Sequence, residues 1–321
     1  MIFNREKLYI SIILIFSLGL NHINVKKKNA FHERYKELIN YENSLFVIIT
    51  VKCDSCGILW FFKNYLGCSM FWIEKGYIPI IDLNSFPNIF NKYNNSFSNI
   101  NPWELYFNQP FGYSLNEVKK NAKNLTKVIC KNYNLPNYTI YNNYVSMEYW
   151  HNMAKKYIPI KRNILEEAEK IRFNLFKSSK DILGVLIRGT DYIKLKPGGH
   201  YIPPTPEIIF KDITNFEKLH HYSYIFVTTE DNEIRKKFID KFKKRIKYFA
   251  PLFYNVSSEK LIAHNKDIIQ NNLKYMKIYL INIIILSKCR DIIVSRTSGS
   301  IGAFILTDGF RYNKVYNLGL Y

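Results

Sequence analysis

The amino-acid sequence predicts an α/β protein built from two facing Rossmann-like domains. The chain has 321 residues, of which 47% are hydrophobic, so it can bury a sizeable core and is not a disordered chain. Short apolar runs alternate with helical segments in two successive blocks, the arrangement typical of parallel sheets. We expect an N-terminal segment over residues 1–43, a first domain over 44–178 and a second over 179–321. A cleft between the two domains is then the natural ligand site.

The first block begins with a strand over residues 44–51 (SLFVIITV), a continuous run of β-branched and aromatic residues that suits a buried parallel strand. A mostly apolar helix over 57–74 and a strand over 78–82 follow, and together they make a βαβ unit. Residues 84–101 are rich in Asn and Ser and predict a surface loop. Ser114, three residues before Glu117, predicts a helix-capping box, and further helices fill 147–176.

The second block repeats the alternation after Asp181. Its expected strands are 182–187, 224–228, 291–295 and 315–318, and its expected helices are 206–219, 231–244, 273–287 and 299–306. The strands are again short and apolar, so this block also predicts a parallel sheet.

The charge balance points to anionic ligands. A formal net charge of +20 attracts phosphates in nucleotides, nucleic acids or an anionic membrane face. A solvated Lys-rich surface explains the same charge equally well. No zinc finger, homeodomain or RNA-recognition motif is found in the sequence, so we predict no nucleic-acid partner. A nucleic-acid-binding protein remains an alternative supported by charge alone.

The N-terminal segment and the cysteines indicate where in the cell the protein is located. Residues 8–20 form an apolar run that is shorter than the roughly 20 residues of a membrane span. It is either the first buried element or a weak anchor whose basic flanks touch anionic lipid. Five cysteines at irregular spacing do not predict a secreted disulfide framework, and the Cys53–Cys56 pair lacks the partners of a zinc site. We therefore expect reduced cysteines and a cytoplasmic protein, with a peripheral position at the inner face of the membrane as a further option.

Arg188, in the segment GVLIRGTDY, is the strongest candidate for a functional residue. It follows a strand directly, so its side chain is expected in the crevice at the sheet edge. A guanidinium binds a diphosphate through two hydrogen bonds and keeps its charge, and Gly189 lets a ligand approach the backbone. The competing interpretation is a structural ion pair between Arg188 and Asp191.

Two more strand-end loops are expected at the same edge. Thr229, Glu230 and Asp231 follow the strand 224–228 and offer groups for a ribose or base, although Thr229 and Asp231 equally suit a helix cap. The turn after strand 291–295 contains Thr297, Ser298, Gly299 and Ser300, whose backbone N–H groups and hydroxyls suit a phosphate at a helix N-terminus. Together the three loops predict a phosphorylated ligand.

The ordered motifs GVLIRGTDY, KPGGHYIPP, IFVTTEDNEI, LSKCRDIIVSRTSGSIGA and NLGLY resemble those of the fucosyltransferase superfamily, in particular of bacterial O-fucosyltransferase-like and α1,6-fucosyltransferase-like proteins. GYIPIIDL and NPWELYFNQPFGYSLNEV extend the resemblance over residues 44–321. It implies a GT-B fold and an inverting, metal-independent transfer from a GDP-sugar co-substrate, GDP-fucose, with no further cofactor. It also implies that Arg188 binds the donor diphosphate, that the turn 297–300 contacts the phosphates from the opposite side, and that residues 44–178 form the acceptor side.

The sequence departs from the family pattern in three places. Leu186 stands where the family often has His, and Gly189 stands where some members have a second Arg. Asn282 and Ile283 stand in the helical region where the family often has an acidic residue. For the base that deprotonates the acceptor, the candidates are Asp191 and the loop residue His200, because imidazole side chains commonly act as general bases. The acceptor is a glycan, a lipid-linked glycan or a protein hydroxyl. The alternative from another class is a non-catalytic nucleotide-sugar- or glycan-binding protein with the same fold.

Overall fold

The computed structural model describes residues 41–91, 100–131, 133–249 and 271–321. The described residues form two parallel sheets, one of three strands and one of five. Most of the predicted N-terminal segment, including the apolar run 8–20, lies outside the described residues. Within them, no helix combines the length and the apolar character that a membrane span requires. The predicted contact with an anionic membrane stays a prediction.

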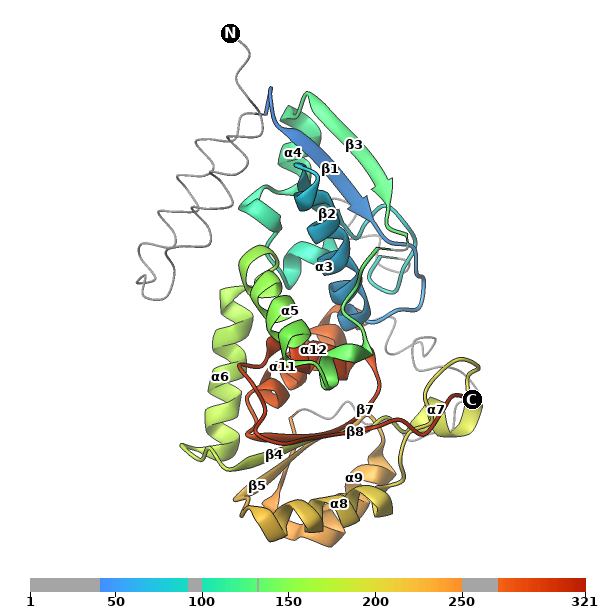
Figure 1. The fold of residues 1–321 in the computed structure, drawn as a ribbon, viewed down its shortest axis with the longest axis vertical. Helices are drawn as coiled ribbons and strands as arrows, with labels where there is room; N and C mark the ends of the chain where they lie inside the picture. The colour runs from blue at the N-terminus through green and yellow to red at the C-terminus, as the bar shows by residue number, and fades with distance from the viewer. Residues whose placement is uncertain (1–40, 92–99, 132, 250–270) are drawn as a thin grey trace.

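The three-stranded sheet comes from the first block of the sequence and has the order β2-β1-β3 (Figure 1). Its elements are β1 (Leu45–Thr50), α3 (Ile58–Glu74), β2 (Ile78–Asp82) and β3 (Asn124–Ile129). The first three match the predicted segments closely. The third strand was not predicted, because β3 pairs with β1 along one side only and exposes much of its length, so it lacks the apolar run of a buried strand.

Short helices follow β2 and lead into a helical region. They are η2 (Pro102–Leu105), η3 (Pro110–Gly112), α4 (Leu115–Asn121), η4 (Tyr138–Tyr141), α5 (Tyr144–Tyr157) and α6 (Arg162–Phe176). The predicted capping box is confirmed at the start of α4, where Ser114 accepts from the backbone N–H of Glu117 and the Glu117 side chain accepts from that of Ser114.

The five-stranded sheet comes from the second block and has the order β6-β5-β4-β7-β8, with every pair parallel. Its strands are β4 (Ile182–Leu186), β5 (Tyr224–Thr228), β6 (Ile246–Lys247), β7 (Asp291–Ser295) and β8 (Asn313–Tyr316). Its helices are α7 (Thr190–Leu195), α8 (Pro206–Leu219), α9 (Asn232–Phe242), η5 (Lys243–Arg245), α11 (Asn272–Ser287) and α12 (Ser298–Leu306). The short helix α7 was not predicted.

Helices cover both faces of this sheet. Val185, Val227 and Ile293 point to the face packed by α8 and α9, whereas their neighbours Leu186 and Val294 pack against α11 and α12. Figure 1 shows α8 and α9 on the far side of the sheet from α11 and α12. The alternation along each strand explains why the strands are apolar throughout.

The two sheets share the helical layer between them. Helix α12 from the second block packs against α3 and α5 from the first, and one continuous apolar core runs through all of them. Gly302 of α12 lies so close to Leu59 of α3 that a β-carbon there would collide with the leucine side chain. The parallel sheets are therefore confirmed, while the division into two separate domains near residue 178, in the connection between α6 and β4, stays a prediction.

The segment predicted as a surface loop over 84–101 is partly buried, which corrects that expectation. Phe90 and Asn88 are almost fully buried. The Asn88 side-chain amide donates to the carbonyl of Leu83 at 2.8 Å, and that of Asn101 donates to the carbonyl of Ile81 at 2.7 Å. Asparagine here satisfies backbone groups at the edge of β2, a role that composition does not distinguish from loop polarity. Residues 92–99 lie outside the described residues.

The cysteines also differ from expectation. Cys53 and Cys56 form a disulfide, and so do Cys68 and Cys130, with Cα–Cα separations of 5.6 and 6.2 Å. Cys289 is a buried thiol. The prediction of reduced cysteines was wrong for these two pairs, because Cys68 on α3 and the residue after β3 meet only through packing around β1. Disulfides persist mainly in oxidising compartments, so the cysteines no longer support a cytoplasmic location.

Candidate functional site

The carboxyl edge of the five-stranded sheet holds the candidate site. The chain runs outward from β4 to β5 and β6 on one side and to β7 and β8 on the other, so the strand order reverses between β4 and β7. In parallel sheets of this kind, ligands bind beyond the carboxyl ends of the strands at such a switch point. Arg188 follows β4 and Arg296 follows β7, so the two arginines flank this point.

Arg188 is held by its neighbours at this edge. Its Nε lies 3.5 Å from Oε1 of Glu230, and its guanidinium carbon lies 4.5 Å from the centre of the Tyr192 ring. Glu230 also accepts a hydrogen bond from the backbone N–H of Gly189 at 2.8 Å. About a quarter of the Arg188 side chain is exposed, so its charge is accessible to a ligand. Arg188 thus forms an ion pair with Glu230, while the side chain of Asp191 lies outside the described residues.

Gly189 and Asp231 are explained by packing. A β-carbon at Gly189 would lie 2.6 Å from both Asp231 Cβ and Ile234 Cδ1, so the glycine lets β4 end close against α9. Asp231 is buried and accepts from the backbone N–H groups of Glu233 at 2.8 Å and Ile234 at 3.0 Å. It is therefore the N-cap of α9, as the competing interpretation held. Thr229 accepts from the Asp231 N–H at 3.1 Å.

The turn 297–300 begins α12 with a capping box. Thr297 Oγ1 accepts from the backbone N–H of Ser300 at 3.1 Å, and Ser300 Oγ accepts from that of Thr297 at 2.9 Å. Ser300 is fully buried and its hydroxyl also lies 2.7 Å from the Tyr141 hydroxyl. Two of the hydroxyls expected to meet a phosphate are therefore engaged in the helix cap, while Ser298 is half-buried at the first position of α12.

Tyr279 of α11 lies beneath the same edge. A β-carbon at Gly299 would collide with its hydroxyl, which explains the glycine at this position. Burial raises the pKa of Tyr279 to about 12; Arg188 acts to lower it, and Glu230 and Tyr192 act to raise it. The phenol is therefore protonated at neutral pH and is no candidate for the base.

His200 is brought next to Arg188 by one intervening tyrosine. Its Nδ1 lies 2.9 Å from the Tyr192 hydroxyl, and the two rings are 5.1 Å apart. The exposed loop that carries His200 is held by the end of the chain, since the backbone N–H of Tyr321 donates to the His200 carbonyl at 3.0 Å. The structure thus brings His200 and Arg188 into contact with the same tyrosine, a link that the sequence did not indicate. Tyr192, four residues after Arg188, was the signal that could have linked them.

Arg296 and its aromatic neighbours were not singled out from the sequence. Its guanidinium carbon lies 5.4 Å from the ring centres of both Tyr138 and Tyr201. The two rings meet edge to face at 4.9 Å. Tyr138 belongs to η4 in the first block, so the first block contributes to this edge. The tyrosine-rich stretch near Tyr138 was a visible signal, which aromatic packing explained equally well from the sequence.

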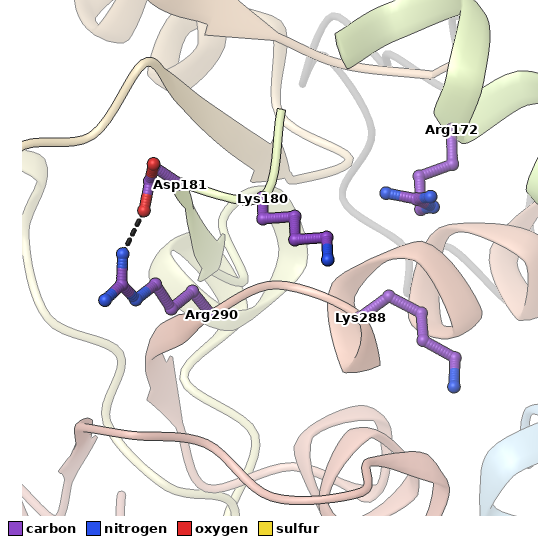
Figure 2. A pocket seen from close by; sticks show the side chains of 5 residues that line it. All are labelled: Arg172, Lys180, Asp181, Lys288 and Arg290. Carbon is purple, nitrogen blue, oxygen red and sulfur yellow. Dashed lines mark hydrogen bonds and ion pairs between the residues drawn. The ribbon is translucent and has the colours of Figure 1, made fainter. Parts of the chain in front are cut away.

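A second basic region lies at the opposite end of the sheet. Figure 2 shows a surface hollow lined by Arg172, Lys180, Asp181, Lys288 and Arg290. Lys180 and Asp181 precede β4 and Arg290 precedes β7, so this hollow lies at the amino ends of the strands. Three of its four cations are paired locally: Arg290 with Asp181, Lys288 with Asp308 at 3.2 Å and Arg172 with Glu169 at 2.7 Å. The carboxyl edge is the better candidate for a ligand site.

Metal ligands do not gather in the part of the chain that the structure describes. No group of three or more His, Cys, Asp or Glu residues there is arranged to hold an ion. Glu230 and Asp231, the acidic residues of the loop after β5, are engaged by Arg188 and by the start of α9. The groups that this edge offers to a phosphate are guanidinium groups.

Comparison with known proteins supports the fold. No protein-family profile matches the chain, and no curated protein matches it. Among solved structures, POFUT1 in complex with GDP matches at a TM-score of 0.50 and 8% identity, over 85% of this chain and 98% of that one. Fucosyltransferase NodZ from Bradyrhizobium matches at 0.45 and 12%, over 83% and 94%, and FUT1 from Arabidopsis thaliana in complex with GDP at 0.48 and 9%, over 96% and 77%. At 8% identity the likeness to POFUT1 is one of fold, and a fucosyltransferase-like fold is what the motifs implied.

Proposed function

We propose that this protein is an inverting, metal-independent glycosyltransferase that transfers fucose from GDP-fucose to a hydroxyl of a glycan, a lipid-linked glycan or a protein. The observation that carries the proposal is the position of Arg188, partly exposed at the switch point of a parallel sheet and held there by Glu230 and Tyr192. A fixed guanidinium at this position suits a diphosphate. The fold shared with POFUT1 supports the same class of donor.

The reaction that we propose is a direct displacement. The acceptor hydroxyl oxygen attacks the anomeric carbon, the bond from that carbon to the phosphate oxygen breaks, and GDP leaves with the electron pair. Negative charge grows on the departing phosphate as this bond breaks. Arg188 stabilises that charge in the transition state, because its position is fixed before the reaction begins.

The acceptor proton needs a base on the opposite side of the sugar. We assign this role to His200, with Asp191 as the second candidate. Hydrogen bonding between Nδ1 of His200 and the Tyr192 hydroxyl fixes the ring and leaves Nε2 for the acceptor. The exposure of His200 allows a bulky acceptor to reach it.

The remaining donor contacts are assigned to the loops at the same sheet edge. We assign Thr229 and Glu230 to the ribose or base, beside the diphosphate bound by Arg188. The turn 297–300 contributes through its backbone N–H groups and Ser298, since the hydroxyls of Thr297 and Ser300 serve the helix cap. Residues 179–321 are then the donor side and residues 44–178 the acceptor side.

A non-catalytic nucleotide-sugar-binding protein is the second candidate function. The side chain two residues before Arg188 is Leu186, which is buried and packs beside Gly299 in the core. No imidazole therefore reaches the crevice from that position. A binding protein with the same fold needs Arg188 but needs no base.

A donor screen distinguishes the two functions. The purified protein is incubated with several GDP-sugars and UDP-sugars and with candidate acceptors, and release of the nucleoside diphosphate is measured. We expect GDP release from GDP-fucose that increases when an acceptor is added. Binding of GDP-fucose without release would favour the binding protein, and faster release from a UDP-sugar would contradict the proposed donor.

A further inference from the structure

We propose that Arg296 is a second binding residue for the donor diphosphate, resting against the paired rings of Tyr138 and Tyr201 on the other side of the switch point from Arg188. The inference rests on the proposed function and deepens it. It assigns the anion contact of the β7–α12 connection to an arginine side chain, in addition to the backbone of the turn 297–300.

The strand register brings the two arginines out at neighbouring strand ends. Leu186 at the end of β4 pairs with Val294 of β7 on one side and with Thr228 of β5 on the other. Two residues beyond these paired positions, past the ends of the strands, come Arg188, Arg296 and Glu230, respectively. Because adjacent strands are about 4.8 Å apart, we expect these three residues to form a row along the carboxyl edge. A group seated over the switch point lies between the two arginines.

The charges along this row are balanced unequally. Arg188 shares its charge with Glu230, 3.5 Å away. Arg296 has no carboxylate partner among the described residues, and its Nε is buried without a hydrogen-bond partner there. A half-buried cation without a counter-charge is costly unless a ligand supplies the charge. We therefore expect a bound anion to contact Arg296 and to balance its charge.

The aromatic rings hold the guanidinium without neutralising it. Tyr138 and Tyr201 each lie 5.4 Å from its central carbon, and cation–π attraction orients the planar group while leaving its N–H donors available. Tyr138 is in turn fixed through η4, where the hydroxyl of Tyr141 lies 2.7 Å from Ser300 Oγ. The position of Arg296 thus depends on contacts from both blocks of the sequence.

A diphosphate is the ligand chemistry that fits this pair. It carries at least two negative charges and enough oxygens to accept from two guanidinium groups at neighbouring strand ends. A single carboxylate on an acidic acceptor would satisfy Arg296 alone. These two sources of an anion are separated by the experiment below.

The test measures binding of GDP, guanosine and inorganic pyrophosphate by calorimetry to the full chain and to Arg296→Gln, which keeps the side-chain stem. We expect the Kd for GDP and for pyrophosphate to rise by about tenfold or more, with guanosine binding unchanged. Arg296→Lys should recover part of the affinity, because an ammonium lacks the planar fork. Arg162→Ala, at an exposed arginine on α6 that pairs with Glu166, is the matched control and should bind like the wild type.

The outcomes separate this inference from the proposed function. GDP and pyrophosphate affinities within about twofold of wild type in Arg296→Gln overturn the inference, and so does a change confined to the KM of an acidic acceptor. Pyrophosphate binding that depends on Arg296 in a protein that binds no nucleotide supports the inference and contradicts the proposed function. If Arg296→Gln does not fold, as judged by circular dichroism, Arg296→Lys decides by the same measurements: wild-type affinity for both ligands overturns the inference.

Discussion

The carboxyl edges of the two parallel sheets differ in what their polar side chains do. In the three-stranded sheet, Asp82 ends β2, is almost fully buried, and accepts from Ser85 Oγ at 2.6 Å and from the Asn84 N–H at 2.8 Å. Lys119 lies 3.2 Å from the same carboxylate. Cys130, directly after β3, is bonded to Cys68. The polar groups and the cysteine at this edge are therefore engaged in contacts that stabilise the fold.

In the five-stranded sheet, the corresponding positions keep accessible charge. Arg188 is partly exposed, and the described surroundings of Arg296 contain aromatic rings but no carboxylate partner. A parallel sheet can therefore present polar side chains at its carboxyl edge whether or not that edge binds a ligand. Whether an edge binds a ligand depends on whether neighbouring groups already satisfy those side chains.

The largest effect is expected from the disulfide at the edge of the three-stranded sheet. Cys68 and Cys130 are 62 residues apart, and closing a loop of that size stabilises the fold by about 4 kcal/mol in the chain-entropy account. The double variant Cys68→Ser/Cys130→Ser should lose about that much free energy of unfolding, measured by urea denaturation. The control is Cys53→Ser/Cys56→Ser, whose short loop predicts a loss below about 2 kcal/mol. Equal losses in the two variants would contradict the loop argument.

The next effect concerns the charged edge. Arg188→Ala should lower kcat/KM for GDP-fucose by at least about 100-fold, roughly 2.7 kcal/mol, because the leaving diphosphate loses its fixed cation. Unfolding by urea should change little, since Arg188 is partly exposed and Glu230 still accepts from the Gly189 N–H. Arg162→Ala serves as the control for loss of a surface arginine. Turnover like that of the wild type would refute the assignment of the site.

The smallest effect on stability is expected at the carboxyl edge of the three-stranded sheet. Asp82→Ala removes the acceptor for Ser85 and Asn84 and should cost about 2 kcal/mol of unfolding free energy. Binding of GDP should remain unchanged, because Asp82 serves the other sheet. Asp240→Ala, at an exposed carboxylate on α9, is the control and should stay within about 0.5 kcal/mol of wild type. A loss of GDP binding in Asp82→Ala would remove the contrast between the two edges.

Much of the fold could be predicted because most strands are apolar on both faces. The runs at 45–50, 182–186 and 291–295 are strong signals for that reason. Strand β3 escaped prediction because it is largely exposed, and α7 because six residues carry no helical period. The disulfides escaped because their cysteines meet through packing between distant elements.

The candidate site was predicted in part. Arg188 could be found because an arginine directly after a buried strand must reach the sheet edge. Asp231 and Ser300 were assigned to a ligand although their hydrogen bonds complete helix caps, and a cap and a phosphate loop use the same residue types at the same position. Arg296 could not be identified as a candidate binding residue from the sequence, because its surroundings include residues from both halves of the chain.

Two blocks of parallel strands, and an arginine at the end of the first strand of the second block, could be predicted from the sequence alone. Hydrophobic periodicity carries that information, because burial acts on each residue locally. Only the packing of the elements brings Glu230 to Arg188, brings Tyr138 to Arg296, and pairs the strands β4 and β7 that the two arginines follow. Those facts depend on strand order and register, which arise from contacts between segments far apart in the chain.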